Sequence, residues 1–326
     1  MEKTKKFSVR KLFSSQYLTL IIVFVVIVVA FYVMNNNYLS TNNIRNIMNA
    51  AILSGMLAIG IACVIISGNP ELSAGAVGCI GGVICTLLLQ AGIPGVPAVL
   101  ITIVCGVAMG LINALLVNVF NVMAFIATLA MASVWKGFAL ILTSGKTISI
   151  SNKAFFWLGT GTIASIPVPI IILILLFIIY GIILARTRFG RSMYMCGGNR
   201  SAARLAGLNP KKISTILFAN SSGLAAFAGA ILAARMHTGS PTAVIGTEFK
   251  GITAAVLGGV AFTGGSGTML GVFIGLLIMN GFNNGLSVVG LGSYWQICAE
   301  GVLLILALLI DYYRTRAKER QMKRIA

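Results

Sequence analysis

Charged side chains are scarce in this sequence. Asp, Glu, Lys and Arg make up 9% of its 326 residues, whereas an average soluble domain has about 25%. Hydrophobic residues make up 58%, so the chain lacks the charge to coat a soluble fold. The runs 18–34 and 170–184 contain no charged residue, and a spanning helix needs about 20 mostly apolar residues at about 1.5 Å each. The sequence therefore predicts an all-α, polytopic membrane protein.

Acidic residues and histidine are scarcer still. The chain has six Asp and Glu residues, of which Glu2 and Glu319 lie in the tails, and one histidine, His237. They form no nucleophile–base pair and no set of metal ligands. The six cysteines contain no C-x-x-C pair and suit small buried positions. We therefore expect no catalytic residue, no metal and no cofactor here, and any nucleotide hydrolysis to occur on another chain.

Basic residues are concentrated at three places, although the net charge is +18. Residues 1–16 hold five Lys or Arg, residues 186–212 hold seven and residues 314–326 hold six. Short basic segments stay on the cytoplasmic side of a membrane. This pattern predicts two cytoplasmic tails, 1–16 and 314–326, and a cytoplasmic loop, 186–212, in one transmembrane domain over 1–326. The charge then serves topology and attraction to anionic lipid rather than nucleic-acid binding.

Ten apolar segments follow one another along the chain. They are 17–34, 47–67, 72–90, 96–117, 123–143, 166–185, 213–235, 250–263, 268–289 and 294–313. Cytoplasmic tails at both ends require an even number of crossings, which ten satisfies. The segment 144–165 then falls on the outer side, and its "AFFWL" patch predicts a short interfacial element.

Two glycine-rich breaks interrupt the apolar runs, one in each half of the chain. They lie within "ACVIISGNPELSAGAVGCIGGVI" (62–84) and "AAVLGGVAFTGGSGTMLGVFIG" (254–275). Paired broken helices in corresponding halves point to a transport site, and the alternative is a pair of ordinary loops between spans. The G-x-x-x-G pairs 106–110, 271–275 and 281–285 predict close helix packing.

The basic segment in the middle of the chain contains "NRSAARLAGL" (199–208). Arg200 and Arg204 are spaced i, i+4 on one helical face, and Ala203, Gly207 and Leu208 give a small apolar side. Such a short helix is unstable alone in water, so it needs a partner surface. The alternative is a plain basic loop.

These segments resemble the permease subunits of bacterial ATP-binding-cassette (ABC) importers for monosaccharides such as ribose, galactose, xylose and arabinose, with autoinducer-2 permeases as near relatives. The resemblance covers about 47–313. It rests on "TRFGRSMYMCGGNRSAARLAGLNPKK", "MAFIATLAMASVWKGFALILTSGKTI" and "AAVLGGVAFTGGSGTMLG". It implies a membrane-embedded permease in a homo- or heterodimer, in the bacterial inner membrane. Its partners would be cytoplasmic ATPase subunits and a periplasmic or lipid-anchored solute-binding protein.

The resemblance also assigns roles to residues. The segment 199–208 would dock on the ATPase, with Asn199, Arg200, Ala203, Arg204, Gly207 and Leu208 as the coupling residues and the two arginines oriented against the ATPase groove. We expect the two breaks, together with residues of "AFIATL" and "NNG", to flank the translocation path of a hydroxyl-rich solute. The residues are Asn69, Glu71, Ser73, Phe125, Thr128, Thr263, Ser266, Asn283 and Asn284.

Three positions depart from the family pattern. Pro70 stiffens the break, which in the family usually reads G-G-I-D-L-S. The acid of that motif is kept here as Glu71. Lys250 stands where the family has an acid, and Glu300 stands where it has a basic residue. Because both signs are inverted and an unpaired membrane charge costs at least about 2.5 kcal/mol, we predict an ion pair between Lys250 and Glu300. The alternative is a Glu300 that is protonated or faces water.

The sequence leaves other solutes and mechanisms open. Permeases for nucleosides and branched-chain amino acids share the broad architecture. A secondary transporter driven by an ion gradient would need ion-coordinating groups within the spans and no docking helix. The main prediction is the permease of an ABC importer for a sugar or sugar-like solute.

Overall fold

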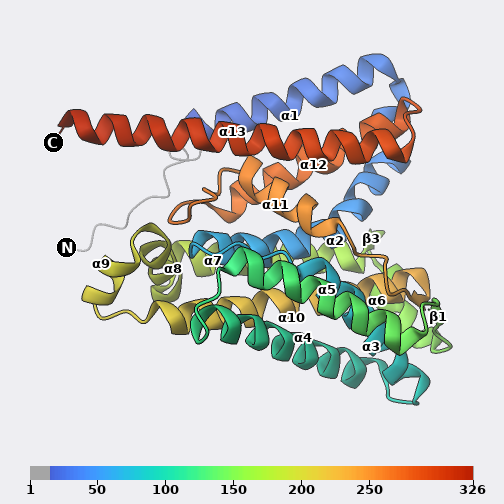
Figure 1. The fold of residues 1–326 in the computed structure, drawn as a ribbon. Helices are drawn as coiled ribbons and strands as arrows, with labels where there is room; N and C mark the ends of the chain where they lie inside the picture. Colours follow the sequence, from blue (N-terminus) through green and yellow to red (C-terminus); the bar gives the residue numbers. More distant parts are fainter. Residues whose placement is uncertain (1–14, 326) are drawn as a thin grey trace, which may run out of the picture.

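The fold was analysed in a computed structural model, which describes residues 15–325 as a helical bundle (Figure 1). The predicted tail 1–16 lies almost entirely outside the described residues. The helices are α1 (Ser15–Met34), α2 (Thr41–Ile66), α3 (Ala74–Gln90), α4 (Gly95–Asn118), α5 (Ala124–Thr143), α6 (Trp157–Thr160), α7 (Val168–Arg186), α8 (Arg188–Gly198), α9 (Arg200–Leu205), α10 (Pro210–Met236), α11 (Thr247–Leu257), α12 (Met269–Val288) and α13 (Ser293–Ile325). Two 3₁₀ turns, η2 (Asn36–Leu39) and η3 (Lys153–Phe156), complete the helical part.

Four two-residue strands lie in the connections. Strand β1 (Ile148–Ser149) pairs antiparallel with β4 (Thr238–Gly239), and β2 (Thr162–Ile163) pairs antiparallel with β3 (Ile166–Pro167). The segment predicted to be interfacial, 144–165, contains β1, η3, α6 and β2, and β3 begins directly after it. Its Phe155 is buried and its Trp157 is exposed. The all-α prediction is therefore confirmed.

Every apolar segment predicted from the sequence coincides with one helix: α1 to α5, α7, and α10 to α13. Among the described residues, eight of these helices are long and apolar enough to cross a membrane. The other two are α3, with 17 residues, and α11, with 11. Each short helix adjoins one of the two predicted breaks, which places a broken helix in each half of the chain.

Small residues bring the central helices close together. The centre is formed by α2 and α10, which have 83% and 67% of their most apolar stretches buried. Gly106 and Gly110 of α4 lie on α10, where a Cβ at Gly110 would collide with the carbonyl oxygen of Phe218. Gly271 and Gly275 of α12 lie equally close to the α11 backbone. The close approach predicted from these G-x-x-x-G pairs is confirmed.

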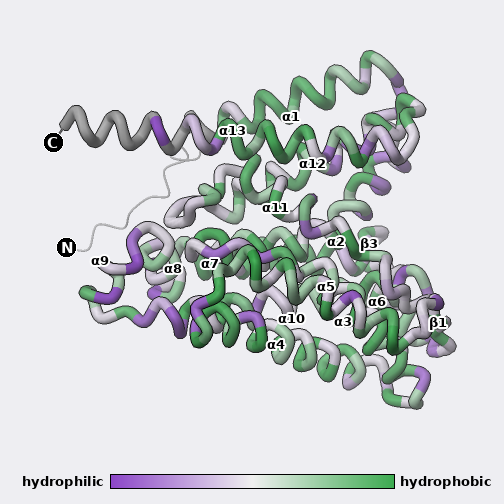
Figure 2. The backbone as a smooth tube through the Cα atoms, in the orientation of Figure 1, coloured by the Kyte–Doolittle hydropathy of each residue, from purple (hydrophilic) through white to green (hydrophobic). Residues whose placement is uncertain are grey.

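The helices α1 and α13 lie at the periphery. Only 11% and 6% of their most apolar stretches are buried, and large side chains exposed on them, such as Val33 and Ile305, are hydrophobic. Most of both stretches has the hydrophobic colour in Figure 2. Such faces suit lipid or another membrane subunit. Gly285 of α12 packs against the ring of Phe31 and so holds α1 to the bundle.

The two ends of the bundle differ in what they carry. Helices α8 and α9 lie at one end, together with the C-terminal end of α13, and β1 and α6 lie at the other (Figure 1). The basic residues of 186–212 are thus at the same end as the C-terminal basic segment. This arrangement agrees with the two segments facing the same compartment.

Candidate translocation and coupling site

The first break, residues 67–73, joins α2 to α3 inside the protein. Asn69, Glu71 and Ser73 are 4%, 0% and 0% exposed. The chain turns at Gly68, whose φ of +84° favours glycine. An ordinary connection between spans would run over the surface. The burial of this segment therefore favours the predicted structural break over the alternative of a plain loop.

Polar side chains from three segments form hydrogen bonds at the first break: the break itself, α4 and α5. Oε1 of Glu71 accepts hydrogen bonds from the backbone N (2.7 Å) and Oγ (2.6 Å) of Ser73, directly before α3, where the helix dipole favours negative charge. Asn113 of α4 donates to Oγ of Ser73 over 2.8 Å. Oγ1 of Thr128 on α5 accepts from the backbone N of Leu72 over 3.2 Å. The predicted residues Glu71, Ser73 and Thr128 thus lie together.

Two further residues belong to this neighbourhood. Phe125, a predicted path residue, lies one turn before Thr128 on α5, and its side chain is 46% exposed. Asn113, which the sequence analysis did not select, is fully buried beside Ser73. Asn113 is the one amide side chain in the apolar run 96–117, and this isolation could have identified it from the sequence.

The second break, residues 258–268, joins α11 to α12 and is held by several other helices. Its Phe262 N donates to Oδ2 of Asp311 on α13 (2.9 Å), and its Gly267 oxygen accepts from the hydroxyl of Tyr194 on α8 (2.7 Å). The predicted path residue Thr263 is exposed at the tip, and Ser266 is half-buried. The break is therefore tied to α8 and to the last helix.

The two breaks meet the basic segment at a cluster of four glycines, Gly68, Gly197, Gly264 and Gly265, here called the glycine junction. The backbone N of Gly265 donates to the carbonyl oxygen of Ile66 over 2.8 Å, which joins the second break to the end of α2. A Cβ at Gly197 would overlap that same oxygen, and a Cβ at Gly264 would lie 2.8 Å from the Cα of Gly68. Backbone thus contacts backbone directly where three distant segments converge.

The predicted docking segment, residues 199–208, forms the short helix α9, and the part of the basic loop before it forms a separate helix, α8. Helix α8 ends at Gly198, and Asn199 then caps α9 by accepting from the backbone N of Ala202 (2.9 Å). The chain turns at Gly207, with a φ of +79°, before α10. The sequence analysis predicted a short helix in 199–208, which is α9, but it did not predict α8.

The side chains of α9 are distributed differently from the prediction. Ala203 is fully buried and Leu208 packs on the core, so the small apolar side faces this same chain. Arg200 donates to Oδ1 of Asn69 over 2.6 Å, so its guanidinium, although exposed, contacts the first break. Arg204 is exposed. The most exposed apolar side chain of the segment is Leu205, at 91%, which the sequence analysis did not select.

The predicted ion pair is present. Nζ of Lys250 on α11 lies 2.8 Å from Oε1 of Glu300 on α13. The same oxygen accepts a hydrogen bond of 2.8 Å from Asn283 of α12, so the pair joins three helices. The neighbouring Asn284 is separate from this group and exchanges hydrogen bonds with Asn43 of α2 (2.7 and 3.0 Å).

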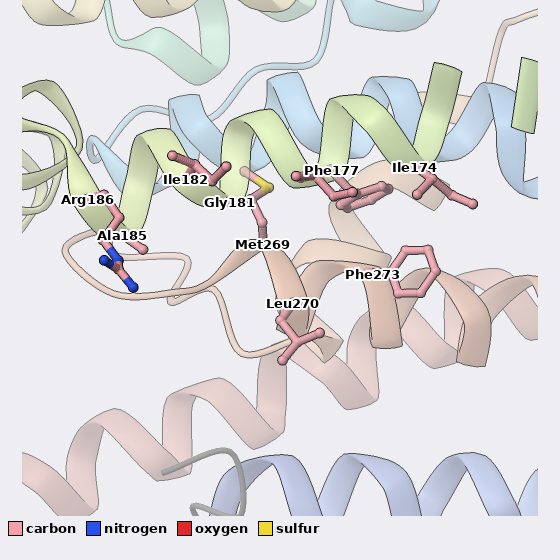
Figure 3. Close-up of a pocket in the computed structure, with 10 residues that line it drawn as sticks. Ile174, Phe177, Gly181, Ile182, Ala185, Arg186, Met269, Leu270 and Phe273 are labelled. Carbon is pink, nitrogen blue, oxygen red and sulfur yellow. The ribbon is translucent and has the colours of Figure 1, made fainter. Parts of the chain in front are cut away.

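An apolar groove lies between α7 and α12 (Figure 3). Its volume is about 450 Å³, and its wall includes Ile174, Phe177, Met269 and Phe273. Arg186 at one end is the only charged residue in the lining. The groove offers a hydroxyl-rich solute almost no hydrogen-bond partner, so its chemistry suits the acyl chains of lipid.

The fold and these contacts define a multi-pass membrane protein of the transporter class, in which buried helix breaks are tied to a basic segment outside the spans. Residues 43–308 match the family model described as the permease component of the branched-chain amino acid transport system. The ribose import permease of Bacillus subtilis is 34% identical over 281 residues, which cover 86% of this chain and 87% of the relative. The ribose import permease of Escherichia coli K12 is 32% identical over 315 residues, with 94% and 98% covered.

A third relative is the L-arabinose ABC transporter permease of Azospirillum brasilense, which is 34% identical over 304 residues and has 93% of this chain and 89% of its own length covered. No solved structure matches the chain. The chain belongs to this permease family of ABC importers.

Proposed function

We propose that this chain forms the path for a sugar or sugar-like solute through the bacterial inner membrane, as one of two permease subunits of an ABC importer. A periplasmic or lipid-anchored binding protein delivers the solute, and separate cytoplasmic subunits hydrolyse ATP. Support comes from the relatives, whose names give ribose and L-arabinose import. The shared location of α8, α9 and the end of α13 supports cytoplasmic termini.

The observation that carries this proposal is the glycine junction. Docking of an ATPase on α9 moves α8, and Gly197 at the end of α8 abuts the last residue of α2. Tyr194 and Gly265 tie the same region to the second break. Because packed backbones do not deform continuously, a displacement of α8 shifts both breaks together.

The exposed side chains of α9 indicate which surface faces the ATPase. Leu205 projects from this short helix, and the exposed Arg204 lies beside it. An apolar anchor beside a charge suits insertion into a groove whose rim is acidic. Arg200 and Ala203 instead fix α9 to its own chain.

The route through the membrane has polar groups toward each end. Asn69, Glu71, Ser73, Thr128, Thr263 and Ser266 belong to the end that carries α8 and α9, whereas Asn283 lies with the ion pair toward the other end. Hydroxyl and amide groups at separate depths let a polyhydroxylated solute pass without a deep binding site.

The test compares Gly197→Ala with Gly198→Ala in the complete importer, reconstituted in vesicles with its ATPase subunits and binding protein. Alanine at 197 collides with Ile66, whereas a Cβ at 198 meets only the Cα of Gly265 at 3.9 Å. We expect Gly197→Ala to assemble but to lose solute-stimulated ATP hydrolysis and uptake, while Gly198→Ala retains both. Equal activity of the two variants contradicts the proposed role of the junction.

One competing solute class is favoured by the family description, which names branched-chain amino acids. Uptake of labelled D-ribose and L-arabinose, measured against labelled leucine, distinguishes the two classes. Uptake that persists without ATP and follows an ion gradient would instead identify a secondary transporter.

A further inference from the structure

A second cavity lies between α11 and α13, near the N-terminal ends of both helices. Its volume is about 670 Å³. The N-terminal end of α13 is at the end of the bundle opposite α9 (Figure 1). In the orientation proposed above, this cavity opens toward the side from which the binding protein delivers solute.

The cavity wall carries hydrogen-bonding groups from both helices. Thr247 comes from α11, and Ser293 and Gln296 come from α13. Phe249, which is 44% exposed, adds an aromatic surface. This lining contrasts with the apolar groove between α7 and α12. It offers the mixture of hydroxyl, amide and aromatic groups that suits a solute with many hydroxyls and a few apolar faces.

The ion pair forms part of the same wall. The side chains of Lys250 and Glu300 are 36% and 17% exposed, so the pair borders the cavity rather than being sealed in the core. Both recorded partners of Glu300, Lys250 and Asn283, contact Oε1. Among the described residues, Oε2 has no hydrogen-bond partner, and it remains available to a hydroxyl donor.

We propose that this cavity is an outer subsite for the solute, in which Glu300, Lys250 and Gln296 contact a neutral polyhydroxylated molecule. The inference rests on the proposed function. A neutral solute is favoured because the pair satisfies its own charges over 2.8 Å. A zwitterion would have to separate the two charges, whereas a hydroxyl group binds the free lone pairs and protons without breaking the pair.

The first measurement tests whether the cavity contains water and solute. Gln296→Cys is introduced into a chain carrying Cys298→Ser and Cys105→Ser, because Cys298 is exposed and Cys105 half-buried whereas the other four cysteines are buried. We expect a charged, membrane-impermeant thiol reagent to modify position 296 from outside. The matched control, Val302→Cys on the same helix, lies outside the cavity lining at a 56% exposed apolar position and should stay unmodified.

The second measurement is uptake of D-ribose and L-arabinose at saturating binding protein. Since the binding protein sets the solute concentration for half-maximal uptake, loss of a permease subsite lowers the maximal rate instead. We expect Gln296→Leu and Thr247→Val to reduce maximal uptake several-fold while stimulated ATP hydrolysis continues, and Val302→Ala to leave both unchanged.

The outcomes separate this inference from the proposed function. Absence of uptake of both sugars by the unaltered importer contradicts the proposed function itself. Normal sugar uptake together with an unmodified Cys at 296, or with full maximal rates for Gln296→Leu and Thr247→Val, overturns the subsite alone. Equal modification at 296 and 302 also overturns it, because the cavity would then be no different from the outer face of α13.

Discussion

The guanidinium of Arg200 donates a hydrogen bond of 2.6 Å to Oδ1 of Asn69, across 131 positions of the chain. Asn69 in turn donates to Oγ of Ser214 at the start of α10 (3.2 Å). The contact links the helix expected to meet the ATPase to the first break by a side-chain bond, in addition to the backbone contacts of the glycine junction. The two arginines of α9 therefore have different environments, and they should differ in mutagenesis.

Reversal of charge at Arg204 should uncouple the importer. Arg204 is exposed on α9, and within the described residues its side chain makes no hydrogen bond or ion pair. We expect Arg204→Glu to abolish solute-stimulated ATP hydrolysis in reconstituted vesicles while the permease still inserts. The control is Lys212→Glu, which reverses another exposed charge at the start of α10. Coupled hydrolysis at the normal rate in Arg204→Glu would contradict the prediction.

The exposed leucine of α9 should anchor the ATPase. Complete burial of a leucine side chain contributes about 1.5–3 kcal/mol, and each 1.4 kcal/mol is about a factor of ten in affinity. We expect Leu205→Ser to weaken binding of purified ATPase subunits by about tenfold or more. Leu291→Ser, at an exposed position just before α13, serves as the control. An unchanged dissociation constant for Leu205→Ser would show that another residue provides the anchor.

The ion pair between Lys250 and Glu300 should be revealed by a charge swap. Each single variant, Lys250→Glu or Glu300→Lys, puts two like charges where the opposite charges of the pair lie 2.8 Å apart. Each should therefore lose most uptake or fail to accumulate. The double variant restores opposite charges. Asn283 can follow the exchange, because its Oδ1 is buried without a partner and can accept from a lysine at position 300. A double variant as poor as the worse single one would show that the pair contributes nothing.

The acid in the first break should act as a hydrogen-bond acceptor for Ser73. Glu71→Gln keeps an oxygen in reach of the backbone N and Oγ of Ser73, whereas Glu71→Ala leaves buried donors unpaired. Leaving a buried donor unsatisfied costs about 1–3 kcal/mol. We expect thermal unfolding in detergent to show a lower midpoint for Glu71→Ala than for Glu71→Gln. A midpoint for Glu71→Gln as low as that for Glu71→Ala would mean that the negative charge, rather than an acceptor oxygen, stabilises the start of α3.

The positions of the helices could be predicted because the membrane imposes a long apolar run on each span. Composition placed all ten segments within a few residues of their helices. The breaks were visible for the same reason, since Gly68, Pro70 and Gly264 interrupt runs that are otherwise uniformly apolar. The pair of Lys250 and Glu300 was predictable because isolated charges within such runs need partners.

Orientation about a helix axis was harder to predict. A six-residue helix such as α9 has too few positions for a periodic pattern to show which side is buried. Ala203 was therefore assigned to the partner surface although it packs inside this chain, and Leu205 was overlooked. Contacts between distant backbones could not be predicted either, because glycine is common in membrane helices and also serves other roles there, such as close helix packing. Nothing in the residues alone identified Gly197 as the point that touches Ile66.

The bond from Gly265 N to the oxygen of Ile66 also has a consequence for biosynthesis. It joins positions that are 199 residues apart (265 minus 66), so it cannot form until about four fifths of the 326 residues have been synthesised. Helices α8 and α9 are therefore synthesised before the second break, which α8 contacts. In the proposed function, the connection from the ATPase-facing surface to the second break is completed only in the last fifth of synthesis.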